Sequence, residues 1–328
     1  MALLLKDAIK PNLVQTLEGN PAIIHGGPFA NIAHGNSSII GDRLALGAAD
    51  IVVTEAGFGS DMGAEKFMHI KAANSGKAPD CVVMNVTVRS MKLHGGAFGS
   101  RGGYRPSREE LDAEDIEAVK RGAQGNLDRH IRNMAGFGMP VIVSINRFTA
   151  DTDGELDALS AAARASGAHA VTLTEVHANG GKGGEPLAKA VVSAIQDHVA
   201  AGRPFTPLFL KDAPVMEKVN GIAKRIYKAE GVDVEAKAKK QLAAIESWGY
   251  GHLPVCMAKT QYSFSHDAGQ LGAPVGFTIP VREFRLNAGA GFIVAVLGNM
   301  MTMPGLPKRP AAADMDMDEN GHLIGVFG

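Results

Sequence analysis

Residues 54–67 read TEAGFGSDMGAEKF and directly follow the apolar run Ile51-Val52-Val53. A short β-branched run, a glycine-rich turn and a helix-like start form the order of elements that a parallel α/β sheet repeats. Asp61 lies near the start of the expected helix, where the helix dipole favours a carboxylate. The stretch therefore predicts a strand over residues 51–54 and a helix over residues 61–73.

The same alternation of strands and helices continues on both sides of this stretch. Apolar runs predict strands over residues 21–24, 81–88, 140–145 and 170–173, and helical stretches lie over residues 36–49, 107–135, 154–166 and 186–201. Near-continuous apolar strands that alternate with helices are typical of a parallel sheet covered on both faces. After Pro207, two amphipathic helices (213–227 and 234–248) and short strands (276–285 and 292–297) follow. The sequence thus predicts an α/β fold with an α+β part at its end.

The bulk composition indicates a well-packed protein with little disorder. The 328 residues are 45% hydrophobic and 20% charged, enough for about two or three domains. A net charge of -1 argues against a general nucleic-acid or membrane-surface binder. No apolar run reaches the roughly 18 residues of a membrane span, and the first residues do not resemble a signal peptide. We therefore expect a cytoplasmic protein whose cysteines, Cys81 and Cys256, are buried free thiols.

The glycine-rich turn of the opening stretch is consistent with two kinds of binding site, one for a phosphate and one for a metal ion. Gly57, Gly59 and Gly63 are spaced G-x-G-x-x-x-G, one residue longer than the dinucleotide fingerprint, and the ribose-binding acid is missing. This argues against an NAD(P)-linked dehydrogenase. A turn at a helix N-terminus can bind a phosphate, but the nearby carboxylates of Glu55 and Asp61 favour Mg²⁺ instead.

Three polar groups follow the predicted strand over residues 81–88. Arg89, Lys92 and His94 precede a pair of glycines, and such groups at a strand end suit an anionic ligand. A solvated basic turn is the alternative. The sequence alone does not separate the two.

Two further loops follow adjacent predicted strands. INRFTADTDGEL (145–156) carries Phe148, which either stacks on a flat heterocycle or caps the core. VHANGGKGG (176–184) is dense in glycine. Loops at the carboxyl ends of parallel strands bind ligands in open α/β sheets, so these two are candidates for the walls of one slot. HGGPFANIAHG (25–35) is a third such loop.

Several long strings in this chain resemble one enzyme family. In order along the chain they are HGGPFANIAHG, TEAGFGSDMGAEKF, VTVRSMKLHGG, PVIVSINRF, LPVCMAKTQYS and AGAGFIVAVLGNMMTMPGLPK. Together they resemble the C-terminal part of formate–tetrahydrofolate ligase, and the likeness runs from residue 1 to residue 328. These strings are long and specific, and VTVRSMKLHGG is close to a signature segment of the family.

The resemblance implies an ATP-dependent ligase with small-molecule substrates. Formate attacks the γ-phosphate to give formyl phosphate, and N10 of tetrahydrofolate then takes the formyl group. Family members need Mg²⁺, respond to monovalent cations and form homo-oligomers, typically tetramers. Their fold is a large P-loop-type nucleotide domain with a parallel sheet, followed by two smaller α/β and α+β domains. The corresponding boundaries here are 1–126 for the remainder of the nucleotide domain, 127–221 for the folate-slot domain and 222–328 for the C-terminal domain.

The family's phosphate loop has no counterpart in this sequence, since G-x-x-x-x-G-K-[ST] does not occur in it. We therefore expect the chain to begin inside the first domain, with an open sheet edge and an uncovered apolar face. The full reaction is then expected to need an N-terminal portion that carries the phosphate loop and that is either a separate subunit or was lost by truncation. A non-catalytic folate-binding or scaffold remnant is the alternative.

The resemblance assigns a folate slot residue by residue. Phe148 matches the family's stacking aromatic, and Leu173 is expected beside it. His177 stands where the family has a tryptophan, which reduces the stacking area. Two further departures are Lys182, in place of a glutamate, and Asn36, in place of a cysteine.

The nucleotide and formyl-phosphate side is assigned to two retained strings. The residues expected to bind nucleotide are Glu55, Gly57 and Gly59. Those expected to be catalytic are Arg89, Lys92 and His94.

Overall fold

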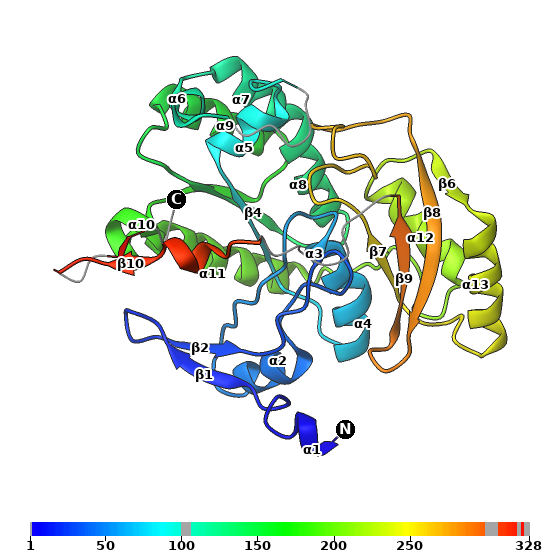
Figure 1. Cartoon of the computed structure of the whole chain (residues 1–328). Coiled ribbons are helices and arrows are strands. Elements are labelled where there is room, and N and C mark those ends of the chain that lie inside the picture. The colour runs from blue at the N-terminus through cyan, green and yellow to red at the C-terminus, as the bar shows by residue number, and fades with distance from the viewer. Residues whose placement is uncertain (1, 100–105, 299–307, 320–322, 325–328) are drawn as a thin grey trace. The chain divides into compact units, whose positions relative to one another are not determined.

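A computed structural model describes residues 2–99, 106–298, 308–319 and 323–324. Figure 1 labels most of its helices and strands. Residues 1–298 and 299–328 form two separate units. The second unit contains the 3₁₀ turn η4 (Ala311–Asp314) and an antiparallel pair of strands, β10 (Asp316–Met317) and β11 (Leu323–Ile324). The end of the last family-like string, residues 299–307, lies outside the described residues.

A three-stranded parallel sheet forms the centre of the first unit. Its strands are β3 (Val82–Val86), β4 (Val141–Asn146) and β5 (Ala170–Thr174), in the order β3-β4-β5. β4 is buried along nearly its whole length, as expected for a central strand with both faces covered. Figure 1 shows α9 (Asp153–Ala165) above this sheet and α11 (Glu185–Ala201) below it. The predicted strands and helices of this region, and the parallel sheet, are confirmed.

Close backbone approach packs the helices next to β3. α5 (Val88–His94) lies against α7 (Ile116–Gly122). A Cβ atom on Gly122 would lie 2.1 Å from the Met91 carbonyl oxygen, so only glycine permits this contact. The packing lays α5, the helix directly after β3, along α7.

The remaining helices of the first unit are mostly short. They are α1 (Ala2–Leu5), α2 (Ile39–Leu46), α3 (Gly63–Lys66), η1 (Phe67–Lys71), α4 (Ala72–Ser75), α6 (Arg108–Asp112), η2 (Ala123–Leu127), α8 (Asp128–Ala135), α10 (Val176–Asn179) and η3 (Gly180–Gly184). α6 begins with the reciprocal hydrogen bonds of a capping box between Ser107 and Glu110, as its sequence favours.

Two predicted strands near the N-terminus differ from the expectation. Residues 51–54 belong to no strand, because no neighbouring strand lies beside them among the described residues. β2 (Pro21–Ile24) forms as predicted, but it pairs antiparallel with β1 (Asn12–Gln15) in an exposed hairpin instead of joining the parallel sheet. Strand formation depends on a partner as much as on local composition.

A four-stranded mixed sheet follows in the chain. Its order is β6 (Gly231–Val234), β8 (Thr278–Asn287), β9 (Phe292–Leu297) and β7 (Val255–Ala258), and only β8 and β9 pair antiparallel. Helices α12 (Val215–Arg225) and α13 (Ala236–Ser247) pack against it. One continuous hydrophobic core runs from η1 through both sheets. The mixed α/β class with parallel pairing is thus confirmed, while the domain boundaries at 126 and 221 stay predictions.

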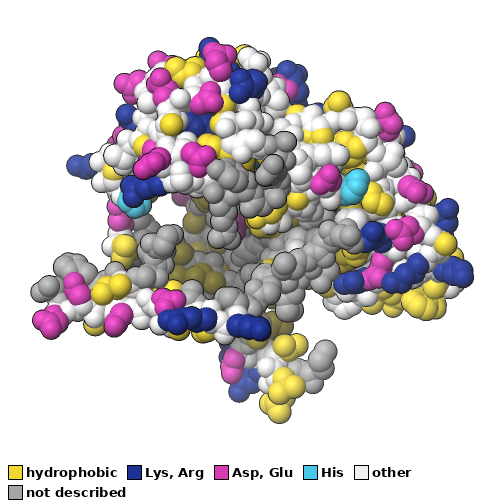
Figure 2. Space-filling view, turned by 45° about the horizontal axis from the view of Figure 1, so that its top comes forward, with side chains coloured by type: hydrophobic (Ala, Val, Ile, Leu, Met, Phe, Trp, Pro, Cys, Tyr) yellow, Lys and Arg dark blue, Asp and Glu magenta, His cyan; other side chains and the backbone are white. Residues whose placement is uncertain are grey.

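The surface carries charges of both signs. Figure 2 shows acidic and basic side chains interspersed over the visible face. None of the helices among the described residues is both long and apolar enough to cross a membrane. Both cysteines are free thiols; Cys256 is buried and Cys81 is partly exposed.

Candidate functional site

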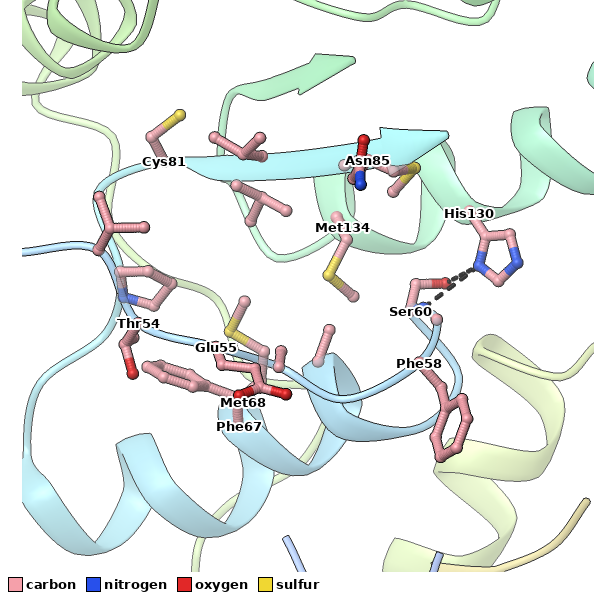
Figure 3. Close-up of a pocket in the computed structure, with 18 of the residues that line it drawn as sticks. Thr54, Glu55, Phe58, Ser60, Phe67, Met68, Cys81, Asn85, His130 and Met134 are labelled. Carbon is pink, nitrogen blue, oxygen red and sulfur yellow. Dashed lines mark hydrogen bonds between the residues drawn. The ribbon is translucent and has the colours of Figure 1, made fainter. Parts of the chain in front are cut away.

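A cavity of about 1290 Å³ lies between β3 and the stretch of residues 51–61. Figure 3 shows β3 along one side and the segment with Thr54, Glu55 and Phe58 along the other. Ser60 and His130 lie at the carboxyl end of β3 in this view. Since ligands bind beyond the carboxyl ends of parallel strands, this end of the cavity is the first candidate site.

A neutral histidine is held at this polar end. The His130 Nδ1 atom lies 3.2 Å from the Ser60 amide nitrogen and 2.7 Å from its Oγ atom. The amide can only donate, so Nδ1 accepts and the ring proton sits on Nε2. Burial lowers the pKa of His130 to about 4. At neutral pH this ring is therefore uncharged and offers an Nε2–H donor.

The neighbouring groups form a buried ion pair and a second neutral imidazole. Lys259 Nζ lies 2.6 Å from Asp61 Oδ2, and both side chains are nearly inaccessible. Burial would raise the pKa of the Asp61 carboxyl, but Lys259 and His130 outweigh it and lower that pKa. His94 Nδ1 accepts from the Gly272 amide at 3.1 Å, and burial lowers its pKa. The charged groups of this site, Asp61 and Lys259, are thus paired with each other. The imidazole N–H groups of His130 and His94 are the donors that remain for a ligand.

The state of His130 predicts a pH dependence of stability. Its folded pKa of about 4 lies below the ordinary histidine pKa of 6.5, so the unfolded chain binds more protons between these values. The free energy of unfolding should therefore fall, by up to about 3 kcal/mol, as the pH drops from 6.5 to 4. Urea denaturation of the protein and of His130→Gln at several pH values measures this. The glutamine variant should lose less stability over that range, and equal losses would contradict the assignment.

The glycine-rich turn of the opening stretch is built by backbone contacts. The Gly57 amide donates to Gly35 O and the Gly63 amide donates to Gly57 O, both at 2.9 Å. A Cβ atom on Gly63 would lie 2.4 Å from Gly57 N, which explains the glycine there. Glu55 is exposed, and Asn36 donates through Nδ2 to the carbonyl oxygens of Glu55 and Gly63. The turn is therefore held against the HGGPFANIAHG loop.

A second candidate site lies where β4 and β5 end. The Arg89 guanidinium stacks over the Phe148 ring at 4.4 Å and also contacts Asp112 Oδ1 at 2.7 Å. Phe148 is 36% exposed, and Leu173 beside the end of β5 is exposed as well. Arg147 spans the two loops, with ion pairs to Asp153 and Glu175. The predicted cation and the predicted stacking aromatic are thus in direct contact.

Other predicted residues lie outside this contact. The Lys92 amino group is buried and pairs with Glu155 Oε1 at 2.7 Å, and it also donates to the carbonyl oxygens of Leu111 and Ala113. His177 in α10 and Lys182 in η3 are exposed. The catalytic role of Lys92 and the stacking role of His177 stay predictions.

The sequence pattern gave no signal for several site residues. His130 and Asn133 from α8 and Lys259, just after β7, meet around Ser60 and Asp61 only in the folded chain. Lys259 lies in the string LPVCMAKTQYS, but no local spacing marks it as part of a site.

Comparison with known proteins decides the family. A profile described as formate–tetrahydrofolate ligase matches residues 1–327. This chain belongs to that family. Among its relatives, the formate–tetrahydrofolate ligases of Ruegeria sp. (strain TM1040) and Roseobacter denitrificans are each 52% identical to it over 327 residues, and that of Paracoccus denitrificans is 50% identical. The match covers 100% of this chain but 56% of each relative. The chain therefore spans a little over half the length of the family members it resembles.

The described residues supply few metal ligands. No group of three or more His, Cys, Asp or Glu side chains in the described part of the chain is placed to hold a metal ion. Asp61 is already paired with Lys259. A magnesium ion at this site would be held mainly by the phosphates of a nucleotide and by water, as is usual for Mg²⁺.

Proposed function

We propose that this chain takes part in the ATP-dependent formation of 10-formyltetrahydrofolate from formate and tetrahydrofolate. Membership of the formate–tetrahydrofolate ligase family supports this. The observation that carries it is the contact between Arg89 and Phe148 at 4.4 Å. Formyl transfer needs an anionic formyl donor beside a flat pterin, and this pair places a cation beside an exposed aromatic ring.

The residues of the second site take separate roles in this proposal. The pterin ring stacks on Phe148, with Leu173 and His177 along the slot. Arg89 binds the phosphate oxygens of formyl phosphate, since guanidinium matches phosphate geometry. Lys92, on the same helix as Arg89, is buried and holds α5 in position through its pair with Glu155. These roles follow from exposure and charge at the ends of β4 and β5.

The transfer step balances without a protein base. N10 of tetrahydrofolate forms a bond to the formyl carbon while the bond from that carbon to the phosphate oxygen breaks. The phosphate leaves with the electron pair and takes the proton that N10 loses. Arg89 stabilises the charge that grows on the leaving phosphate. His94, whose Nδ1 accepts from Gly272, is left with an Nε2–H that can donate to a phosphate oxygen.

The nucleotide side of the proposal extends beyond this chain. Glu55, Gly57 and Gly59 are proposed to line the nucleotide cleft, and the triphosphate itself is assigned to the phosphate loop of an N-terminal portion, whether that portion is a separate subunit or part of a longer chain. Mg²⁺ would neutralise the phosphates, and a monovalent cation is proposed as well. A homo-oligomer in the cytoplasm, with the domain boundaries at 126 and 221, completes the assignment.

Replacing Phe148 by alanine tests the folate slot. Stacking on an aromatic ring contributes about 1–3 kcal/mol, so the dissociation constant for tetrahydrofolate should rise about 10- to 100-fold. Anaerobic titration calorimetry of the chain with tetrahydrofolate measures this. Trp248→Ala is the matched control, because Trp248 is an exposed aromatic residue at the end of α13.

Equal affinities for the protein and Phe148→Ala would contradict the proposed slot. Tetrahydrofolate binding with no formyl transfer, even after a phosphate-loop polypeptide is added, would instead favour a folate-binding module without ligase activity.

A further inference from the structure

A long loop from the mixed sheet returns to the first candidate site. It joins β7 to β8 over residues 259–277 and forms no helix or strand; loops longer than about 15 residues are uncommon in compact domains and are often functional. Lys259 at its start belongs to the buried ion pair of that site. The centre of the Phe264 ring lies 5.1 Å from the Arg129 guanidinium and 4.5 Å from the His130 ring. The loop therefore packs on α8, the helix that carries His130, as Figure 1 also shows.

Two side chains, one from η2 and one from α8, hold a single turn of this loop. Arg129 donates from Nη1 to the carbonyl oxygen of Pro274 at 2.6 Å and from Nη2 to that of Ala273 at 3.1 Å. Asn126 is 4% exposed and donates from Nδ2 to the carbonyl oxygen of Gly272 at 2.9 Å. A planar guanidinium and a buried amide thus bind three successive carbonyl groups, and the guanidinium presents its donors in a rigid fork. The turn cannot move without breaking these bonds.

The same turn contacts His94. The Gly272 amide donates to Nδ1 of His94 at 3.1 Å, and a Cβ atom on Gly272 would lie 3.2 Å from the His94 carbonyl oxygen. Gly272 also has a φ of +75°, so both its conformation and its surroundings favour glycine. An amide that donates to Nδ1 leaves the ring proton on Nε2 and disfavours a second proton on the ring. The contact therefore fixes the tautomer of His94 and the orientation of its ring.

We propose that Arg129 and Asn126 are positioning residues for His94 and act through the turn of residues 272–274. They hold the turn, the amide of the turn holds the imidazole ring, and the Nε2–H group remains available to an anion. Burial lowers the pKa of His94 and outweighs the nearby Asp61 carboxylate, which would raise it, so the ring is neutral at neutral pH. That the anion is a phosphate rests on the proposed function, whereas the hold on the ring does not.

Long-range proton–nitrogen NMR of the histidine-labelled chain at about pH 8 tests the hold, with His94→Gln identifying the signals. The Nδ1 of His94 should give the signal of an unprotonated nitrogen. Arg129→Ala should move this signal toward that of a protonated nitrogen, because the released ring samples both tautomers, and should speed hydrogen exchange of the Gly272 amide at least about tenfold. The affinity for inorganic phosphate, followed at Nε2, should fall about 2- to 10-fold, the usual effect of losing one hydrogen bond.

Arg132→Ala is the matched control. Arg132 lies on the same helix, but its side chain is exposed and pairs with Asp128, so its loss should leave the His94 signals and the exchange of Gly272 unchanged. Arg129→Lys keeps the charge but replaces the fork by a single ammonium group, so it should release the ring in part. If Arg129→Ala does not fold, Arg129→Lys takes its place in the comparison.

The outcomes separate this inference from the proposed function. A protonated Nδ1 of His94 in the unmodified chain overturns the inference, and so does an unchanged His94 signal in the Arg129 variant that is compared. Equal changes in the Arg129 and Arg132 variants also overturn it, because they would indicate a general loosening of α8. If Arg129→Ala releases the ring but inorganic phosphate leaves Nε2 of the unmodified chain unaffected, the hold on His94 stands and the role that the proposed function gives His94 fails.

Discussion

Glu155→Ala should lower the free energy of unfolding by about 3–5 kcal/mol, because it leaves the buried Lys92 ammonium without its counter-charge. Lys92 and Glu155 are 1% and 0% exposed and lie 2.7 Å apart. The Glu155 carboxylate also accepts from the Asp115 amide at 2.9 Å and the Thr152 amide at 3.2 Å. One side chain therefore joins α5 and the starts of α7 and α9. Urea denaturation at pH 7.5 measures the loss.

Two further variants show whether the buried charge is the cause. The double variant Lys92→Met with Glu155→Leu removes both charges and should recover a large part of the lost stability. Glu117→Ala breaks the exposed pair of Glu117 with Lys120 and should change stability by about 0–1 kcal/mol. If the double variant is no more stable than Glu155→Ala, the lost hydrogen bonds at the starts of α7 and α9, and not the unpaired charge of Lys92, account for most of the lost stability.

Arg89→Ala should lower kcat for formyltetrahydrofolate formation about 10²- to 10³-fold, the usual effect of losing one group that stabilises transition-state charge. The assay is the chain combined with the phosphate-loop polypeptide, supplied with formate, ATP and tetrahydrofolate. The KM for tetrahydrofolate should change much less, since the proposed stacking of the pterin on Phe148 remains. Arg89→Lys keeps the charge but loses the planar stacking on Phe148, so it should restore activity only in part.

Arg108→Ala is the matched control for Arg89. Arg108 reaches the same carboxylate, Asp112, at 3.5 Å, but its side chain is almost fully exposed. Its loss should leave kcat within about twofold, because screened surface pairs contribute little. An equal fall in both variants would mean that Asp112, and not the charge of Arg89, controls the rate.

Regular elements with strong local signals were predictable from the sequence. The apolar run before Asn146 is β4, and the helix that begins after Thr152 is α9. Periodicity and capping act over a few neighbouring residues, so they can be read directly. Residues 51–54 were predicted as a strand for the same reason. That prediction was wrong for the described chain, because a strand needs a neighbour that local composition does not supply.

The polar contacts of the two candidate sites were not predictable from the sequence, because they join residues that are distant along the chain. Ser60 and His130 are 70 residues apart in the chain yet hydrogen-bond at 2.7 Å, and no spacing in the sequence connects them. Arg89 and Phe148 were each predicted as ligand residues, but only the adjacent ends of β3 and β4 bring the guanidinium onto the ring. Lys92 was also predicted as a site residue, but the fold buries its ammonium group in an ion pair with Glu155.

The sequence by itself determined the alternation of strands and helices, the parallel sheet and the family, because hydrophobic period and long specific strings are properties of the linear chain. Tertiary structure alone decided which charges are paired, which histidines are neutral and which turn holds His94. Those depend on burial and on contacts between segments distant in sequence, and such contacts exist only once the sheet and its helices have packed together.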